Sequence, residues 1–286
     1  MKPIVDSLIF RLFNPGVTIV DKVVYSIPEE AILNPEVKFL DPAMGGGQFL
    51  RGILDRAILL GMTHEDILPR LFGIEKSIVY VNHAKWKLGL DGANLKVSSC
   101  YDLEVFSMEF DYIVGNPPYG KNASLAVKFL NKSFELAPFI SFVLPKTFRK
   151  PSVINRIHSN LHLVEDVDVS DDAFGGTIMT CHQKWECREE KRSQIETYAQ
   201  HPDLDFVSKV ESNVFVGRVG AAAGSVKKSG FDHYSEVHYF LKASETVCEK
   251  LNSIQPRLKE LARSSTVGTP SLSKHELIST YISMFG

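Results

Sequence analysis

The segment FLDPAMGGGQFL at residues 39–50 decides the fold of this chain. A short apolar run ends on Asp41, three consecutive glycines follow, and a helix-like stretch begins at Gln48. Glycine lets the backbone turn tightly and approach a ligand closely, so the segment predicts a strand, a ligand-binding turn and a helix. A plain strand-to-helix turn explains the glycines alone equally well. The segment is neither a P-loop nor a GxGxxG turn, and the adjacent acid favours a ligand that carries an ammonium group.

Outward from this segment, strand-like and helix-like stretches alternate from residue 37 to residue 169. The apolar runs are short and unbroken, which is typical of strands covered on both faces. The alternation predicts an α/β fold with a mostly parallel, Rossmann-like sheet and helices on both faces. The expected strands are 37–41, 71–75, 95–99, 112–115, 139–144 and 161–169, with a further strand at 176–186. The expected helices are 48–60, 77–88, 125–137 and 152–159.

The composition is that of an ordinary globular protein: 286 residues, of which 44% are hydrophobic and 23% charged. This length suits one large domain or two modest ones. After about residue 190 the sequence becomes polar, and a segment rich in glycine and alanine and a helical stretch at 244–262 follow. We therefore expect a catalytic domain at 1–190 and a smaller unit at 191–286.

Several classes of protein are excluded by simple patterns. No apolar run approaches the roughly 20 residues that span a bilayer, and no secretory signal is evident, so we expect a cytoplasmic protein without a membrane partner. Cys100, Cys181, Cys187 and Cys248 form no CxxC pair, which suits reduced thiols and no metal site. The net charge of −2 means that a nucleic-acid partner needs a local basic patch. The oligomeric state is not indicated.

Acids follow two later strands, where open parallel sheets bind their ligands. Glu75 ends the expected strand 71–75, and a carboxylate there can accept both hydroxyls of a ribose. Asp102, or its neighbours Cys100 and Tyr101, follows the next strand and could accept from an adenine amino group. An ordinary surface acid is an equally good interpretation of Asp102.

The motif GNPPYG at residues 115–120 carries the chemistry. Two prolines remove backbone donors after a strand, which leaves acceptors in excess. The side-chain oxygen of Asn116 and the carbonyl of Pro117 can then point at one amino group, with the Tyr119 ring alongside. Two acceptors localise the lone pair of a conjugated amine, so positioning and fixed dipoles suffice for attack on a methyl donor. A proline-capped strand end explains Asn-Pro but not the whole motif.

Together these motifs resemble those of the S-adenosylmethionine-dependent DNA adenine N6-methyltransferases, over roughly residues 14–188 and in the order of the gamma subgroup. The resemblance implies a class I methyltransferase fold, S-adenosyl-L-methionine as cofactor and a flipped adenine as substrate. The implied cofactor-binding residues are Asp41, Ala43, Gly45, Gly47, Glu75 and Asp102, with the segment 14–24 packed over them. Asn116 and Pro117 would polarise the amino group, Tyr119 would stack on the base, and Phe174 would cover its other face or serve the core.

Double-stranded DNA is the expected partner. Residues 121–156 contain seven basic residues against one acid, directly after the catalytic motif. We expect Lys146, Arg149 and Lys150 to contact phosphates, although solvated helix faces would also explain the lysines. By its position in the family, 191–286 would read the target sequence.

Four alternatives to DNA methylation stay open. RNA adenine N6-methylation is hardly excluded by the sequence. Protein glutamine N5-methyltransferases also use Asn-Pro-Pro-Tyr, but that family places a helical domain before the cofactor motif, and here Asp41 leaves no room for one. A catalytically silent DNA-binding relative has little reason to retain Asn116, Pro117, Tyr119 and the acids together. A nicotinamide dehydrogenase lacks the glycine spacing.

Overall fold

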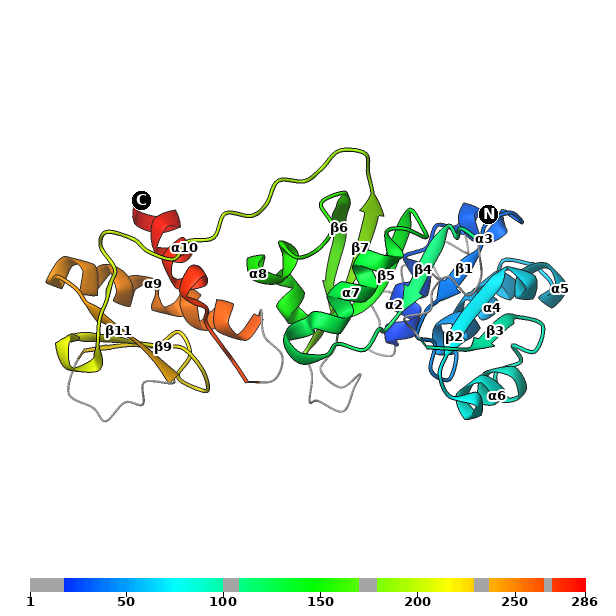
Figure 1. Ribbon diagram of the computed structural model, residues 1–286, viewed down its shortest axis with the longest axis horizontal. Coiled ribbons are helices and arrows are strands. Elements are labelled where there is room, and N and C mark those ends of the chain that lie inside the picture. Colours follow the sequence, from blue (N-terminus) through cyan, green and yellow to red (C-terminus); the bar gives the residue numbers. More distant parts are fainter. Residues whose placement is uncertain (1–17, 100–107, 170–178, 229–236, 265–268) are drawn as a thin grey trace. The chain divides into compact units, whose positions relative to one another are not determined.

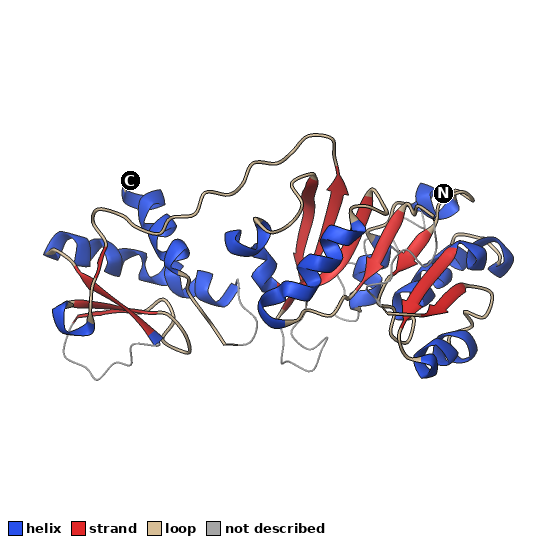
Figure 2. Ribbon diagram, viewed as in Figure 1, coloured by secondary structure: helices blue, strands red, loops and turns tan. Residues whose placement is uncertain are grey.

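The chain forms two compact units, shown as ribbons in Figures 1 and 2. This computed structural model describes residues 18–99, 108–169, 179–228, 237–264 and 269–286. The first unit comprises Met1–Leu144, Arg156–Gly176 and Thr180–Ser193. The second comprises Pro145–Asn155, Thr177–Met179 and Gln194–Gly286. Residues 145–155 therefore belong to the second unit, although the chain on both sides of them belongs to the first.

The first unit is built on a seven-stranded sheet in the order β3-β2-β1-β4-β5-β7-β6. The pairs β1–β2, β1–β4, β2–β3 and β4–β5 are parallel, whereas β6 and β7 pair antiparallel at one edge. The strands are β1 (Phe39–Asp41), β2 (Leu71–Glu75), β3 (Asn94–Val97), β4 (Tyr112–Gly115), β5 (Phe139–Pro145), β6 (Leu161–Asp168) and β7 (Thr180–Cys187). The predicted fold class, a mostly parallel Rossmann-like α/β sheet with helices on both faces, is thereby confirmed.

Both faces of this sheet are covered. Neighbouring residues of a strand point to opposite faces, and Phe39 and Leu40 are both fully buried, as are Ile113 and Val114. One face packs against α2, α3 and α4 in a single core, and in Figure 1 α7 lies in front of the sheet. The helices of this unit are α2 (Ile19–Tyr25), α3 (Glu29–Leu33), α4 (Gln48–Leu59), α5 (His64–Ile67), α6 (Ile78–Lys87) and α7 (Ser124–Ser133).

The predicted boundaries hold best for the central strands. The strands at 71–75 and 112–115 are found as predicted, and the others differ by a few residues at one or both ends. The helix predicted at 152–159 is wrong in extent, because α8 is only Pro151–Ile154. The helix ends at its C-cap Asn155, whose side chain exchanges hydrogen bonds of 2.8 and 2.9 Å with the backbone of Ile195. The His158 N–H donates to the side chain of Asn131 at 2.8 Å rather than to a helix carbonyl.

The second unit has its own sheet and core. The sheet has the order β10-β9-β11-β8, and all three pairs are antiparallel. Val216 and Leu241 of the sheet pack with Leu251 and Ile278 of two helices. The elements are β8 (Asp205–Phe206), β9 (Val214–Gly217), β10 (Val226–Lys228), β11 (His238–Lys242), α9 (Glu245–Ser264) and α10 (Lys274–Phe285). Among the helices that the structure describes, none has the length and apolar character needed to cross a membrane.

Candidate active site

The glycine-rich turn is held at the carboxyl ends of β1 and β2. The Met44 N–H donates to the carbonyl of Ile74 at 3.0 Å, which ties the turn to the end of β2. Gly47 has φ +87°, and a Cβ there would lie 2.9 Å from the Cβ of Ala84, so only glycine allows α4 to begin this close to α6. A Cβ on Gly45 would meet no atom within 4 Å, so the turn leaves open space beside Gly45.

Glu75 fixes the shape of this turn. One carboxylate oxygen accepts the Gly45 N–H at 3.2 Å and the other accepts the Ser77 N–H at 2.9 Å. A carboxylate has about four lone-pair sites, so each oxygen keeps capacity for a further donor. The half-buried Glu75 side chain therefore holds the turn and can also bind a ligand hydroxyl.

Asp41 is buried with an acceptor to spare. Its side chain is at the end of β1, and only 1% of the residue is exposed. Oδ1 accepts the Ala43 N–H at 3.1 Å, whereas Oδ2 is buried and has no hydrogen-bond partner among the described residues. Burial raises the pKa of Asp41 to about 7; the Ala43 hydrogen bond opposes the rise and the charge of Glu75 adds to it. A cationic donor at Oδ2 would stabilise the ionised form.

The Asn116 loop meets Asp41 because β4 lies beside β1. Leu40 pairs with Ile113 in the parallel ladder, which brings the two strand ends together. A Cβ on Gly115 would lie 2.7 Å from Oδ1 of Asp41, so a side chain there would collide with the carboxylate. Asn116 is therefore one residue from the contact with the buried acid, at the same edge of the sheet.

Asn116 and Tyr119 also leave polar atoms unpaired. The Asn116 Oδ1 and the Tyr119 hydroxyl are both buried without a hydrogen bond of acceptable geometry in the described part of the chain. Burial raises the pKa of Tyr119 above its usual range; Cys181 adds to the shift, and the nearby Asn116 side chain opposes it. The Tyr119 carbonyl accepts the Leu125 N–H at 3.0 Å, which anchors the loop to α7.

The structure brings most of the predicted site together. The residues that lie at this one edge are Asp41, Ala43, Gly45, Gly47, Glu75, Asn116, Pro117 and Tyr119. Asp102 and Phe174 lie outside the described residues, as do the alternative Cys100 and the segment 14–17. Within the described ranges, no group of three or more His, Cys, Asp or Glu side chains could hold a metal ion.

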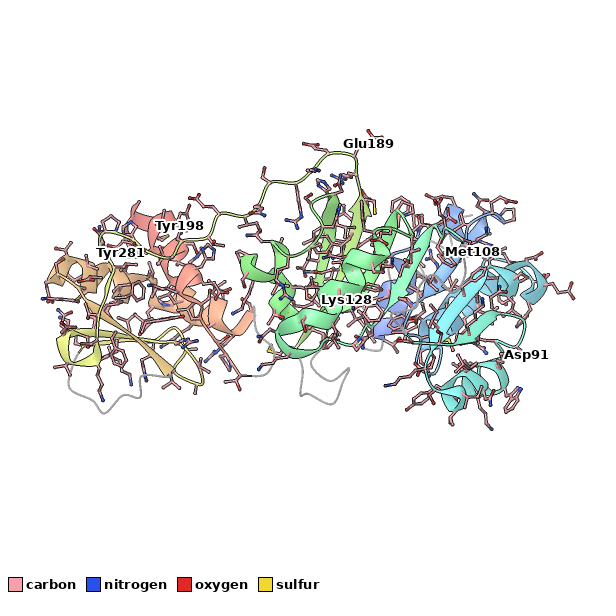
Figure 3. All side chains as sticks on the ribbon, in the orientation of Figure 1. Asp91, Met108, Lys128, Glu189, Tyr198 and Tyr281 are labelled. Carbon is pink, nitrogen blue, oxygen red and sulfur yellow. The ribbon has the colours of Figure 1, made fainter. Side chains whose placement is uncertain are left out.

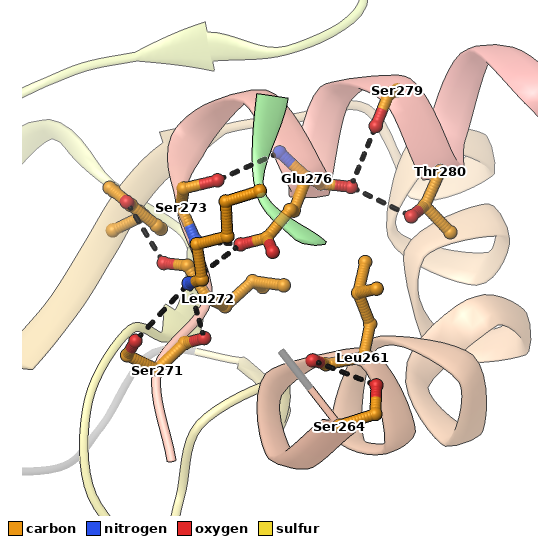
Figure 4. Close-up of polar contacts among 10 residues, drawn as sticks. Leu261, Ser264, Ser271, Leu272, Ser273, Glu276, Ser279 and Thr280 are labelled. Carbon is orange, nitrogen blue, oxygen red and sulfur yellow. Dashed lines mark hydrogen bonds and ion pairs between the residues drawn. The ribbon is translucent and has the colours of Figure 1, made fainter. Parts of the chain in front are cut away.

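The three predicted phosphate contacts differ in their surroundings. Lys146 is only 5% exposed, and Arg149 is half-buried. The Lys150 ammonium lies 3.4 Å from Oε2 of Glu276 and 3.4 Å from the carbonyl oxygen of Ser271. Figure 4 shows Ser271 and Glu276 in this cluster. Lys128, labelled on α7 in Figure 3, is exposed. The phosphate contacts of Lys146, Arg149 and Lys150 stay predictions.

The sequence did not predict a role for Gly115 in the site. Its role depends on the register between β1 and β4, which are about 70 residues apart in sequence, and no local pattern reports that register. The only signal was the position of a glycine directly before Asn116.

No family model matches the chain, and no curated protein matches it. Solved structures are similar at low identity. A protein assigned as the modification subunit of a type I restriction enzyme from Vibrio vulnificus YJ016 has a TM-score of 0.48 and 16% identity over 90% of this chain and 59% of that chain. A protein assigned as a class I S-adenosylmethionine-dependent methyltransferase from Listeria monocytogenes has a TM-score of 0.48 and 14% identity over 64% and 62%. TrmN from Thermus thermophilus has a TM-score of 0.45 and 20% identity over 59% and 48%. This chain spans less than two thirds of each of these three.

Proposed function

We propose that the first unit binds S-adenosyl-L-methionine and methylates the exocyclic amino group of adenine at specific sites in DNA. The observation that carries the proposal is a set of three buried oxygens at one sheet edge, Asp41 Oδ2, Asn116 Oδ1 and the Tyr119 hydroxyl, none of which has a hydrogen-bond partner among the described residues. Buried polar atoms are almost always paired in a protein whose only need is stability. Oxygens left unpaired together favour a ligand that supplies several donors.

The acceptor oxygens of the site suit this cofactor. Asp41 Oδ2 can accept from the ammonium of the methionine end, and the open space beside Gly45 allows a ligand to lie against the backbone of the turn. Glu75 retains lone pairs for the two ribose hydroxyls. By the family resemblance Asp102 would bind the cofactor adenine. When bound, the cofactor supplies a methyl group made electrophilic by its sulfonium.

Asn116 and Pro117 would activate the amine. Asn116 Oδ1 has no competing donor in the described part of the chain, so it is available to accept one amino hydrogen of the target base while the Pro117 carbonyl accepts the other. Both acceptors draw the amine lone pair out of conjugation and toward the methyl donor. Because these dipoles are fixed before the reaction, they stabilise the charge that develops on nitrogen without reorganisation.

Tyr119 would hold the target base. An adenine inside a duplex must leave the stack, which costs a few kcal/mol. Stacking on an aromatic ring returns about 1–3 kcal/mol per base, and the hydrogen bonds that anchor the Tyr119 backbone hold the ring in place. Phe174 would cover the other face of the base.

The acceptor is the finer part of the proposal. The basic residues after the catalytic motif and the family resemblance favour DNA, and the second unit would then read the target sequence. RNA adenine and protein glutamine present similar conjugated amines and remain the competing acceptors.

Labelled S-adenosylmethionine incubated with the purified chain and separate DNA, RNA and protein acceptors tests the proposal. We expect label in DNA, as N6-methyladenine at one sequence context in single-molecule sequencing. Asn116→Ala should lose this label. Asn252→Ala is the matched control for Asn116→Ala, because Asn252 is exposed on α9 and its side chain bonds only to its own helix. The proposal is overturned if the label enters RNA or protein in preference to DNA. It is also overturned if none of the three acceptors is labelled.

A further inference from the structure

A concavity of about 620 Å³ lies on the second unit. Its walls come from residues 200–202 and 204–206, which end in β8, and from Lys274, the first residue of α10. Its volume is within the range of about 300–1,000 Å³ that is usual for ligand sites. None of its residues belongs to the proposed active site.

Lys274 presents an ammonium that has no counter-ion among the described residues. Its Nζ lies 3.8 Å from the centre of the Phe206 ring, a cation–π contact that holds the charge at the wall of the concavity. No described carboxylate lies within ion-pairing distance of it. Lys274 also stands at the start of α10, where the helix dipole disfavours a cation. An anion in the concavity would satisfy the ammonium and relieve that repulsion.

His201 adds a second donor of fixed direction. Its Nδ1 accepts the Asp203 N–H at 3.1 Å, so the neutral ring carries its proton on Nε2. The ring packs edge-to-face on the buried Tyr281 at 5.2 Å, which restrains its orientation; Tyr281 is labelled in Figure 3. Nε2 has no partner among the described residues.

We propose that this concavity binds a phosphate group of the nucleic-acid backbone. The Lys274 ammonium, the His201 Nε2–H and the exposed side-chain amide of Gln200 supply donors from three side chains, which suits the oxygens of a phosphate. Asp205 is the one acid of its lining, and it lies opposite Lys242 across the sheet, beside a compensating charge. The assignment of the phosphate to a nucleic-acid backbone rests on the proposed function. The capacity of the concavity to bind a phosphate does not.

Binding of a labelled DNA duplex, followed by fluorescence anisotropy over a series of salt concentrations, tests the backbone contact. We expect Lys274→Met to weaken binding about fivefold to tenfold and to reduce the slope of log K against log salt by about 0.9, the value for one phosphate contact. Lys209→Met is the matched control, because Lys209 is an exposed lysine of the same unit. Equal binding by wild type and Lys274→Met, or equal losses in both variants, overturns the proposal.

Titration with inorganic phosphate and with a mononucleotide, followed through the His201 ring signals in NMR spectra, separates the sources. We expect shifts in the wild type that vanish in Lys274→Met. If they occur in a chain that neither binds nor methylates DNA, the concavity serves a small phosphate ligand and the proposed function fails. If DNA is methylated but neither Lys274→Met nor phosphate has an effect, the phosphate site fails and the proposed function stands.

Discussion

Two clusters of buried polar groups, one in each unit, differ in whether their hydrogen bonds are complete. In the second unit Glu276 pairs with Lys150 and accepts the Ser273 N–H at 2.6 Å, and Lys150 also donates to Ser271. Figure 4 labels Ser271, Ser273 and Glu276 of this cluster. At the sheet edge of the first unit, Asp41, Asn116 and Tyr119 each leave a buried oxygen unpaired. An unpaired buried group costs about 1–3 kcal/mol. The cluster of Lys150 and Glu276 is built for stability. The cluster of Asp41, Asn116 and Tyr119 carries a cost that a ligand can remove.

The largest effect should come from removing one of the unpaired acceptors. We expect Asn116→Ala to lower the rate of methyl transfer about 100-fold to 1,000-fold, the usual loss when one preorganised hydrogen-bonding group is removed from a reacting centre. Cofactor affinity should be nearly unchanged, because in the proposed function Asn116 accepts from the target amine and does not contact the methionine end. Single-turnover methylation and calorimetric titration with S-adenosylmethionine measure the two quantities.

The same variant distinguishes a catalytic group from a structural one. Because Asn116 Oδ1 has no partner to lose, Asn116→Ala should leave the free energy of unfolding unchanged or slightly higher. Trp86 and Trp185, the two tryptophans of the chain, both lie in the first unit, so their fluorescence follows its unfolding. Near-normal turnover, or a clear loss of stability, would remove Asn116 from the proposed role.

The completed cluster should respond in the opposite way. Lys150 and Glu276 have side chains only 13% and 6% exposed, so Lys150→Met removes the Lys150 ammonium from beside a buried carboxylate. We expect the second unit to lose about 2–3 kcal/mol of unfolding free energy, toward the lower end for buried pairs because the contact is long at 3.4 Å. Hydrogen exchange of the α10 amides measures the loss.

A double variant and a surface pair serve as controls for that prediction. Lys150→Met with Glu276→Gln should lose less than the sum of the single changes, since no charge is left buried. Lys228→Met breaks the exposed pair with Glu245 and should change little. Additive losses in the double variant would mean that the buried pair does not act as a unit.

The sequence predicts the sheet of the first unit better than the second unit. Apolar runs such as 71–75 and 112–115 are bounded by polar or turn residues, so their extents follow from local pattern alone. In the second unit the helical stretch at 244–262 was predicted and is found as α9. Its strands were not predicted, because elements such as β8 and β10 have only two and three residues and carry too little pattern to be recognised. The predicted helix 152–159 is too long, because the His158 N–H donates to Asn131, 27 positions earlier, which no local pattern shows.

In the candidate site, too, features set by local pattern could be predicted and those set by long-range contacts could not. Asp41, Glu75 and Asn116 could be placed at one edge from sequence, because the carboxyl ends of adjacent parallel strands meet there. The contact between Gly115 and Asp41 could not, since it depends on strand register. Nor could the sequence show that Lys150 faces Glu276, which lies 126 residues later.

A smaller effect is expected in the pH dependence of stability. Asp41 has a pKa of about 7 in the folded chain, above its ordinary value of 3.8, so the stability linked to this group is complete below pH 3.8 and is lost as the pH rises through 7. Between pH 5 and pH 8 the wild type should lose about 2 kcal/mol relative to Asp41→Asn, which cannot ionise. Urea unfolding followed by tryptophan fluorescence at several pH values measures the difference.

The cofactor sharpens this test. If the methionine ammonium binds the ionised Asp41, saturating S-adenosylmethionine should lower the pKa of Asp41 and shrink the difference between wild type and Asp41→Asn. Affinity for the cofactor should also fall below pH 7, by at most tenfold per pH unit for one proton. A pH dependence that is the same in both proteins would show that Asp41 does not titrate in this range.

The smallest effect separates the ring of Tyr119 from its hydroxyl. Tyr119→Phe removes a buried hydroxyl that has no partner, so the first unit should gain up to about 1 kcal/mol of unfolding free energy. Its ring still stacks, so methylation should stay within a few-fold of wild type, whereas Tyr119→Ala should lose base capture while keeping cofactor affinity. The fluorescence of 2-aminopurine at the target position reports base capture. If the alanine variant gives the wild-type signal, or if the phenylalanine variant loses stability, the hydroxyl has a partner within the folded chain and the contrast between the two clusters fails at this residue.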